Sequence, residues 1–332
     1  MCDAGGMCAS HEAFLAGEGM EMLLRSLWHN LKRWRRIHLG PVAVTFKLER
    51  SVNVTGNTRS RLRDAWRRDQ NWRQSHAANP AGTLPEAPPL PAVDEGSKIG
   101  IALIVGVGPG FGYATAKCLA KAGMEVVLAS RNACRLDALV SEIEAEGGIA
   151  FAYGCDATSE ASVQELFAHV RSVHGVPDLV VYSIQSFGPG QTIDIEVTAF
   201  EDGWRQNCLG SFLIAREAAR AMQPLKRGTI VLVGSTSALL GREGHLNLAI
   251  GKFGQRVLAQ VLAREMWPMG IHVAHLVIDA DINEGAERLD GGPQSDPKHI
   301  ADMVLSLHRQ PASAWTSEMD ARPWNEQFWK HC

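Results

Sequence analysis

Apolar and polar residues follow two rhythms between residues 98 and 325. The first rhythm consists of short apolar runs rich in β-branched residues, such as "IALIVGVG", "EVVLAS" and "GTIVLVGS", which predict buried strands. The second consists of longer stretches with helical spacing, including one from Phe200 to Met222 and one that begins after the capping residue Ser159. Strand and helix alternate repeatedly, which predicts an α/β fold with a parallel sheet and helices on both faces.

Residues 1–97 have a different pattern. Basic residues and tryptophans gather in "LWHNLKRWRRIHLG", and five prolines follow in "NPAGTLPEAPPLPAVDEGSK". No sustained hydrophobic periodicity accompanies them, so we expect a poorly ordered N-terminal extension that ends at residue 97. A contact of this extension with nucleic acid or a membrane surface stays open. We expect residues 326–332 to form a short C-terminal tail.

The composition is that of an ordinary globular protein. It is 45% apolar and 21% charged, with a formal net charge of −3, which gives no sign of general binding to polyanions. The seven cysteines are scattered without a CxxC pair, so we expect reduced thiols, no metal site and a cytoplasmic location. No apolar run reaches the roughly 18–20 residues that a membrane span needs.

A glycine-rich turn lies between the first predicted strand and the first predicted helix. The sequence there is "VGVGPGFGYA", with glycines at positions 106, 108, 110 and 112. Glycine permits unusual backbone angles and a close approach of the main chain to a pyrophosphate, whose charge the start of the helix stabilises. Because the turn has this strand-to-helix context, it predicts a dinucleotide site.

The end of the second predicted strand bears on the choice of cofactor. NAD sites place a carboxylate there, but this chain has Ser130, Arg131 and Asn132. An arginine can pair with a 2′-phosphate, so Arg131 favours NADP, with NAD as the alternative. Asp156, in "GCDAT", is placed to bond the adenine amino group.

These motifs resemble the short-chain dehydrogenase/reductase family over residues 98–325. The resemblance is carried by "GVGPGFG", "CDAT", Asn207 in "WRQNCLGSF", Ser235 in "VLVGSTSA" and Lys252 in "AIGKFGQRVLAQ". It implies a Rossmann-type doubly wound sheet of about seven strands, often assembled into dimers or tetramers through the long helices. It also implies hydride transfer between NADP(H) and a carbonyl or alcohol substrate.

The resemblance assigns roles to individual residues. Ser235 would orient the substrate oxygen, Lys252 would hold the nicotinamide ribose, and Asn207 would position a water in a proton relay. These three are the candidate catalytic residues. The candidate cofactor-binding residues are Gly106, Gly108, Gly110, Phe111, Gly112, Arg131, Asp156, Ala157, Ser183 and Lys252.

The chain departs from the family pattern at several positions. Leu248 stands where the family keeps a catalytic tyrosine, and Ser183 and Gln185 replace residues of an Asn-Ala-Gly motif. The stretch "IDADINEGAERLDGGPQSD" lacks the usual Pro-Gly pair. Loss of a positioned acid typically costs about 10²–10⁴ in rate. His245 is one candidate substitute because histidine titrates near neutral pH, and Asn247 and Ser237 are weaker ones.

Two functions stay open from the sequence. The first is an NADP-dependent oxidoreductase acting on a small carbonyl or alcohol, and forming a homo-oligomer. The second is a nucleotide-binding protein without turnover, acting as a sensor or partner subunit. Leu248 favours the second, while Ser235, Lys252 and Asn207 favour the first.

Overall fold

The computed structural model describes residues 100–282 and 294–327, together with helical residues at positions 64, 67, 68, 70 and 71. The chain divides into two units, Met1–Ser51 and Val52–Cys332, and all described residues belong to the second. The predicted N-terminal extension, residues 1–97, and the predicted tail, residues 326–332, therefore lie largely outside the described residues. Their poor order stays a prediction.

Seven parallel strands form the central sheet, in the order β3-β2-β1-β4-β5-β6-β9. Their bounds are β1 Ile101–Val105, β2 Glu125–Ser130, β3 Ile149–Gly154, β4 Leu179–Tyr182, β5 Gly228–Ser235, β6 Ile271–Ile278 and β9 Glu318–Ala321. A separate short pair joins β7 (Asp281–Ile282) to β8 (Gln294–Ser295). The order of the strands reverses between β1 and β4. The predicted doubly wound parallel sheet of about seven strands is confirmed.

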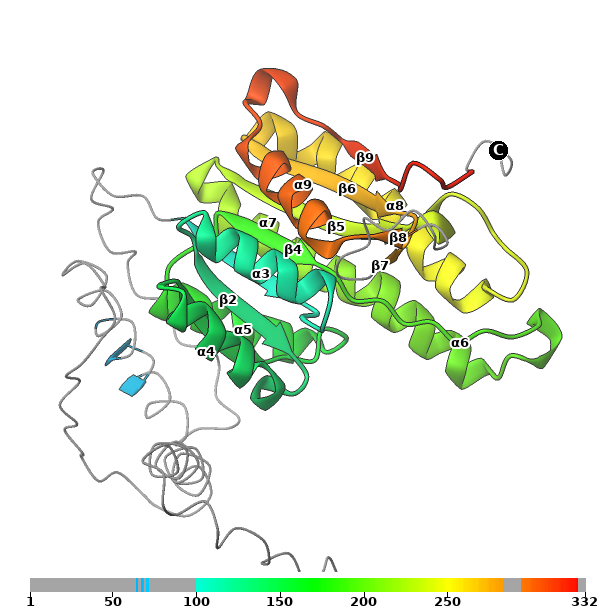
Figure 1. Ribbon diagram of the computed structural model, residues 1–332, viewed down its shortest axis with the longest axis horizontal. Helices are drawn as coiled ribbons and strands as arrows, with labels where there is room; N and C mark the ends of the chain where they lie inside the picture. Colours follow the sequence, from blue (N-terminus) through cyan, green and yellow to red (C-terminus); the bar gives the residue numbers. More distant parts are fainter. Residues whose placement is uncertain (1–63, 65–66, 69, 72–99, 283–293, 328–332) are drawn as a thin grey trace, which may run out of the picture. The chain divides into compact units, whose positions relative to one another are not determined.

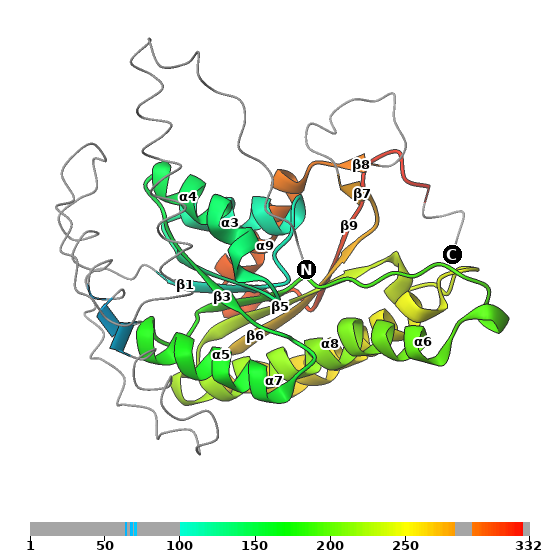
Figure 2. The same ribbon diagram turned by 90° about the horizontal axis from the view of Figure 1, so that it is seen from below.

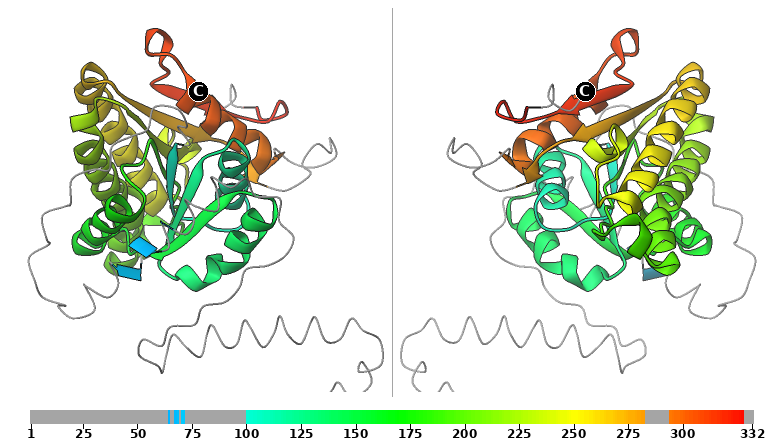
Figure 3. Two further views of the ribbon diagram at one scale, coloured as in Figure 1. Left: turned by 90° about the vertical axis from the view of Figure 1, so that its left-hand side faces the viewer. Right: turned by 90° about the vertical axis from the view of Figure 1, so that its right-hand side faces the viewer.

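Helices cover both faces of the sheet (Figures 1 and 2). One face carries α3 (Phe111–Lys121), α4 (Asp137–Ala145) and α9 (Pro297–Arg309), and the other carries α5 (Glu160–Val173), α7 (Gly210–Met222) and α8 (Leu246–Met266). Figure 3 shows the sheet between the two helix layers. This arrangement explains the continuous apolar runs, because every strand in the middle of the sheet is buried on both sides.

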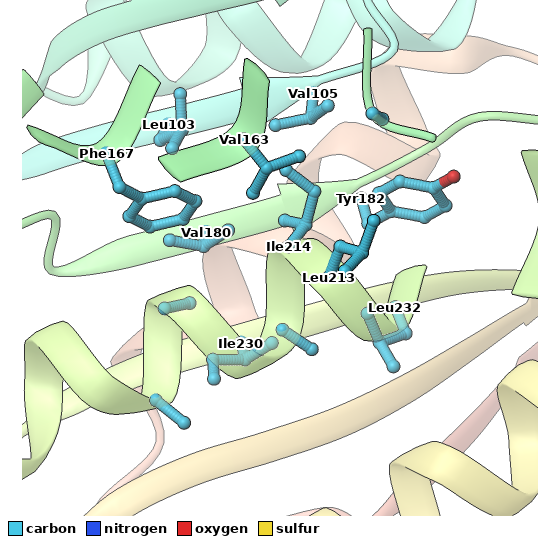
Figure 4. Packing of buried hydrophobic residues seen from close by; sticks show 14 of the residues in the cluster. Leu103, Val105, Val163, Phe167, Val180, Tyr182, Leu213, Ile214, Ile230 and Leu232 are labelled. Carbon is cyan, nitrogen blue, oxygen red and sulfur yellow. The ribbon is translucent and has the colours of Figure 1, made fainter. Parts of the chain in front are cut away.

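The core consists of two hydrophobic clusters, one on each face. Successive residues of a strand point to opposite faces, so Leu103 and Val105 enter one cluster while Ala102 and Ile104 enter the other. Figure 4 shows the first cluster, in which side chains of α5 and α7, such as Phe167, pack on those of the strands. The sheet is thereby held rigidly, with its carboxyl ends exposed for a site.

The predicted helix from Phe200 to Met222 is interrupted. Helix α6 (Val197–Trp204) begins earlier, and a π-helical turn over Arg205–Leu209 joins it to α7. The side chain of Asn207 in this turn donates a hydrogen bond to the carbonyl oxygen of Gly203, four residues earlier, at 2.9 Å. The side chain therefore satisfies a carbonyl that a regular helix would bond through its backbone.

Four cysteines lie among the described residues, and none of them forms a disulfide there: Cys118, Cys134, Cys155 and Cys208. Burial raises the pKa of the Cys155 thiol to about 11, which disfavours the reactive thiolate. In this part of the chain, no three His, Cys, Asp or Glu side chains gather where they could hold a metal ion. No helix among the described residues combines the length and apolar character needed to cross a membrane.

Candidate cofactor and active site

A cavity of about 1220 Å³ lies at the carboxyl ends of the parallel strands. Residues that follow β1, β2, β4, β5 and β6 line it, among them Gly106, Arg131, Ser183, Thr236 and Asp279. Open parallel sheets bind ligands in this place, where the order of the strands reverses. The volume exceeds the roughly 300–1,000 Å³ of a site for one drug-sized ligand, so a dinucleotide and a small substrate can share it.

The cavity has two ends of different character. We call the side formed by residues 106–112, Arg131 and Asp156 the glycine end. We call the side formed by residues 202–206, residues 235–237 and residues 242–248 the α8 end, because its last segment leads into α8. The predicted dinucleotide residues lie at the glycine end, and Ser235, His245 and Leu248 lie at the α8 end.

Backbone geometry explains the glycines of the turn. Gly106 has a φ of +94°, and a Cβ atom there would lie 2.8 Å from the backbone nitrogen of Ile184. A Cβ on Gly112 would lie 3.0 Å from the Cα of Val107. By contrast, a Cβ on Gly108 would meet no atom within 4 Å, so this position borders open space. The turn is thus packed against β4 and open toward the cavity.

Helix α3 begins at this turn without a side-chain cap. Gly110 is the N-cap, with a φ of +85°, and no side chain bonds the first backbone N–H groups of the helix. Unpaired N–H groups and the positive end of the helix dipole attract anions. Phe111 is buried in the core at the start of α3 and anchors the turn. The predicted pyrophosphate cradle therefore fits the residues present.

Arg131 and Asp156 flank the glycine end. Arg131 is exposed, lines the cavity and has no ion-pair partner among the described residues. Asp156 is oriented by the Thr158 backbone N–H and hydroxyl group, which donate to its Oδ1 at 2.9 and 2.8 Å. Ala157 is buried beside it and also lines the cavity. The structure brings these three residues together with the turn, as the sequence predicted.

Ser183 ties β4 to the glycine turn. Its hydroxyl donates to the carbonyl oxygen of Gly106 at 3.1 Å and lies 3.3 Å from that of Val105. Ser183 and Gln185 both line the cavity. The serine at this departure from the family motif therefore has a structural partner of its own.

Ser235 ends β5 at the cavity. Its Oγ atom is buried and has no hydrogen-bond partner among the described residues. Buried hydroxyl groups are nearly always paired, and an unpaired one costs about 1–3 kcal/mol. The hydroxyl is therefore available to a bound molecule, as expected for a group that orients a substrate oxygen.

Asn207 does not reach the cavity. It is fully buried, and its amide forms two bonds with the Ser186 backbone: Nδ2 donates to the carbonyl oxygen at 2.8 Å, and Oδ1 accepts from the N–H at 3.1 Å. A Cβ on Gly251 would clash with the Cβ of Asn207, so α8 and the π-helical turn are in close contact at this point. Asn207 thus positions the segment after β4, and its predicted role in a water relay stays a prediction.

Lys252 is also buried behind the residues that line the cavity. Its Nζ donates to the carbonyl oxygens of Val233 (2.8 Å) and Ile184 (3.2 Å) and to Oε1 of Gln255 (3.2 Å). Burial lowers the pKa of the Lys252 ammonium to about 7. The side chain therefore links the carboxyl ends of β4 and β5, and its predicted contact with a ribose stays a prediction.

The hydroxyl group of each of the three tyrosines is already engaged in a hydrogen bond. The Tyr182 hydroxyl donates to the carbonyl oxygen of Gln206, and burial raises its pKa far above the ordinary value. In Figure 4 this hydroxyl points away from the other labelled side chains. Tyr113 bonds the carbonyl oxygen of Arg135 at the glycine end, and the Tyr153 hydroxyl bonds His174. Leu248, 4% exposed, lines the cavity instead.

His245 is the N-cap residue of α8 and lines the cavity. Its Nδ1 donates to the carbonyl oxygen of Glu243 at 2.8 Å, which places the proton of the neutral ring on Nδ1. The ring is stacked on Phe187, with centroids 4.8 Å apart. These two contacts fix the ring, and Nε2 has no partner among the described residues.

Comparison with known proteins identifies the family of this chain. A family model described as short chain dehydrogenase matches residues 100–280. The chain belongs to this family. One relative is a sorbitol-6-phosphate 2-dehydrogenase from Escherichia coli (strain K12), 32% identical over 181 residues, which are 54% of this chain and 70% of the relative. Another is a D-threitol dehydrogenase from Mycolicibacterium smegmatis, 25% identical over 198 residues, 59% of this chain and 75% of the relative.

Solved structures of short-chain dehydrogenases have the same fold. One from Rhodopseudomonas palustris is 32% identical and has a TM-score of 0.61. The match covers 69% of this chain and 100% of that one. A metagenomic short-chain oxidoreductase in complex with NADP is 25% identical, also with a TM-score of 0.61, and the match covers 68% of this chain and 98% of that one. The predicted family and fold are confirmed, and the chain is a member of a family of oxidoreductases.

This short chain dehydrogenase has further cavity residues that the sequence analysis missed. Asp279, directly after β6, accepts a hydrogen bond from the Thr236 hydroxyl and pairs with Arg322. Its position after a strand was a signal that could have identified it. Arg205, in the π-helical turn, and Arg242, in the loop before α8, also line the cavity, and no motif marks either position.

Proposed function

We propose that this short-chain dehydrogenase transfers a hydride between NADP(H) and a small carbonyl or alcohol substrate. One observation carries the proposal: a single cavity joins an uncapped glycine turn to the unpartnered hydroxyl of Ser235. The first feature suits a pyrophosphate, and the second suits a substrate oxygen. NADP(H), when bound, supplies or accepts the hydride.

The glycine end supports NADP(H) as the cofactor. The backbone N–H groups at the start of α3 would bind the pyrophosphate, and Asp156 would accept from the adenine amino group. Arg131 would pair with the 2′-phosphate, for which no carboxylate at the end of β2 competes. The metagenomic relative whose structure contains NADP is consistent with this choice.

At the α8 end, Ser235 would donate a hydrogen bond to the substrate oxygen, and His245 would supply the proton. Leu248 has no proton to give, although it occupies the position at which the family pattern has tyrosine. His245 lies at the N-cap one turn before Leu248, with its ring fixed by Glu243 and Phe187. In reduction, the proton on Nε2 of the imidazolium would pass to the carbonyl oxygen as the hydride reaches the carbonyl carbon.

Lys252 would act through the backbone it holds. Its ammonium bonds the carbonyl oxygens of Ile184, just after β4, and Val233, in β5, and both residues line the cavity. It would therefore fix the separation of the two strand ends between which the cavity opens. In this role it is a positioning residue, and Asn207 does the same for Ser186.

Titration of the full chain with NADPH and NADH, followed by a panel of aldehydes and ketones, tests the proposal. We expect NADPH to bind more tightly than NADH, and NADPH oxidation to depend on an added carbonyl compound. Tight NADPH binding without turnover of any carbonyl or alcohol would favour the second function, a nucleotide-dependent sensor or partner subunit. Leu248 is the residue that favours this alternative. No binding of either nucleotide would refute both functions.

We also propose that the chain forms a homo-oligomer through α7 and α8. Helix α8 exposes an apolar stripe at Ile250, Phe253, Val257 and Val261, and Phe212 of α7 is exposed beside it. The spacing of three or four residues places the stripe on one side of the helix. Light scattering should give a dimer or larger, and Val257→Glu should reduce the mass. Lys298→Glu, on the opposite face of the sheet, should leave it unchanged.

A further inference from the structure

Two arginines at the α8 end have no partner in the part of the chain that the structure describes. Arg205 lies in the π-helical turn after α6, and Arg242 lies in the loop before α8; both line the cavity. Neither forms an ion pair or a hydrogen bond with any described residue. Arg256, by contrast, binds both carboxylate oxygens of Glu318, at 2.8 and 2.7 Å.

The nearby carboxylates do not neutralise these arginines. Glu243, next to Arg242 in sequence, accepts a hydrogen bond from Gln191 at 2.9 Å instead. The Asp279 carboxylate accepts a hydrogen bond from Thr236 and forms an ion pair with Arg322. Asp202 also lines the cavity, but this exposed carboxylate forms no ion pair with either arginine.

The burial of Arg242 makes this arrangement informative. The residue is half-buried, so its guanidinium has lost part of its hydration without gaining a protein partner. An anion that enters the cavity would replace that hydration. Arginine suits this task because its planar group donates two parallel hydrogen bonds to a carboxylate or a phosphate.

Apolar side chains line the same cavity as these arginines. Leu248 is buried against the cavity, and the ring of Phe187 is stacked on His245. A ligand here therefore meets an apolar side chain, the Ser235 hydroxyl and two cationic groups in one cavity. This combination matches a carbonyl compound with a short carbon chain and an acidic end.

We propose that the α8 end binds the anionic group, a carboxylate or a phosphate, of the carbonyl substrate through Arg242, assisted by Arg205. The inference rests on the proposed function, because it names the substrate class of the same reaction. His245 and Ser235 would act on the carbonyl oxygen while the arginines hold the other end of the molecule.

Matched probes test the inference on the full chain saturated with NADPH. The first pair is 4-oxopentanoate and 2-pentanone, which differ in the terminal carboxylate. The second is dihydroxyacetone phosphate and dihydroxyacetone, which differ in the phosphate, so the two pairs separate the two anions. Calorimetry should show the anionic member of at least one pair binding about tenfold to hundredfold more tightly than its neutral partner. Added salt should reduce that preference.

Three variants localise the effect. Arg242→Gln should remove most of the preference for the anion while leaving the affinities for the neutral probe and for NADPH unchanged. Arg131→Gln should weaken NADPH binding relative to NADH without changing the preference for the anion. Arg264→Gln, on the exposed side of α8, should change neither.

Each failure has its own meaning. If NADPH binds but charged and neutral probes bind equally, or no anionic probe binds, the anion subsite is refuted and the proposed function stands. If the preference survives Arg242→Gln but not Arg131→Gln, the probe occupies the cofactor phosphate site, which also refutes the subsite. If NADPH does not bind the wild-type chain, both proposals fail together.

Discussion

The two ends of the cavity are built from different parts of the chain. At the glycine end, main-chain atoms create the site: a turn with positive φ at Gly106 and Gly110 and the free N–H groups at the start of α3. At the α8 end, side chains create it: Ser235, His245 and Arg242, each from a different segment. The first site depends on a local backbone shape, whereas the second depends on tertiary structure.

Because of this difference, we expect recognition of the cofactor phosphates to be constrained by the backbone and the chemistry toward the substrate to vary with single side chains. A backbone cradle recognises phosphate, which is common to all dinucleotides, and tolerates few substitutions. A site made of side chains can change its chemistry by single replacements without altering the fold. Variants at the two ends should therefore fail in different ways.

The largest effect is expected from Gly106→Ala. The new Cβ would lie 2.8 Å from the Ile184 backbone nitrogen, at a φ of +94° that side chains disfavour. We expect NADPH affinity to fall by about a hundredfold or more and stability by roughly 1–3 kcal/mol. Fluorescence titration and thermal unfolding measure the two quantities.

Gly123→Ala is the matched control for backbone strain. Gly123 has a φ of +92°, but a Cβ there meets no atom within 4 Å, and the residue does not line the cavity. It should lose roughly 1 kcal/mol of stability and no NADPH affinity. Equal NADPH affinity in the Gly106→Ala and wild-type proteins would contradict the assignment of the glycine end.

The next effect is expected at the other end, from His245→Asn. Asparagine cannot donate a proton of suitable acidity, so kcat should fall by about a hundredfold with NADPH affinity unchanged. The charged groups that share this end, Asp202, Arg205 and Arg242, remain in the variant, as does Glu243 beside the ring.

A second substitution distinguishes proton donation from a structural role. Leu248→Tyr in the His245→Asn background should restore part of kcat, because it supplies an acidic hydroxyl at the position of the family tyrosine. Diethylpyrocarbonate should modify His245 in the wild-type protein, and a bound carbonyl compound should slow this reaction. His299→Asn, on an exposed part of α9, should leave kcat intact. A wild-type rate in His245→Asn would exclude it as the donor.

A smaller effect is expected from Ser235→Ala, with about a tenfold loss of kcat. Its stability should equal or exceed that of wild type, because the removed hydroxyl is buried and has no partner among the described residues. Ser211→Ala should instead lose stability and keep kcat. The Ser211 hydroxyl donates to the Cys208 carbonyl oxygen at 2.6 Å, and Ser211 does not line the cavity. Turnover assays and denaturant unfolding report both patterns, and loss of stability without loss of kcat in Ser235→Ala would contradict this role.

The smallest effect concerns the pH dependence of stability through Lys252. Its pKa is lowered to about 7 in the folded chain, so between about pH 7 and 10.5 the unfolded chain binds more protons at this group. The free energy of unfolding should therefore gain a contribution that rises with pH in that window, by at most about 1.4 kcal/mol per unit. Thermal unfolding at several pH values measures it.

Lys252→Met removes that contribution. Buried thiols such as Cys155, with a raised pKa, act in the opposite direction at high pH, so the difference between wild type and Lys252→Met is the informative quantity. A difference that does not change with pH would show that the ammonium is not destabilised by burial.

The sequence predicted the fold because each signal for it is local. β-branched runs, helical spacing and the Ser159 cap are visible within a few residues, and the structure confirms that Ser159 caps α5. The glycine end was predicted for the same reason, since its turn is one continuous segment between β1 and α3. The early start of α6 and the π-helical turn were missed, because no breaking residue marks them.

The α8 end was predicted less completely. Ser235 was found through the family pattern, but the burial of Lys252 and Asn207 behind the cavity depends on contacts with Val233 and Ser186 from other elements. Arg205 and Arg242 lie far apart in sequence, and only the fold brings them to one cavity. Long-range packing of this kind leaves no periodic trace in one sequence.

Helix α8 has two working faces. Leu248 and Lys252 lie on its inner side, and Val257 and Val261 are exposed on its outer side. If subunits associate through the outer side, then α8 contributes residues both to the subunit interface and to the active site. Catalysis would then be coupled to the association equilibrium of the subunits. Diluting the protein would lower the activity per chain, and a ligand bound in the cavity would favour association.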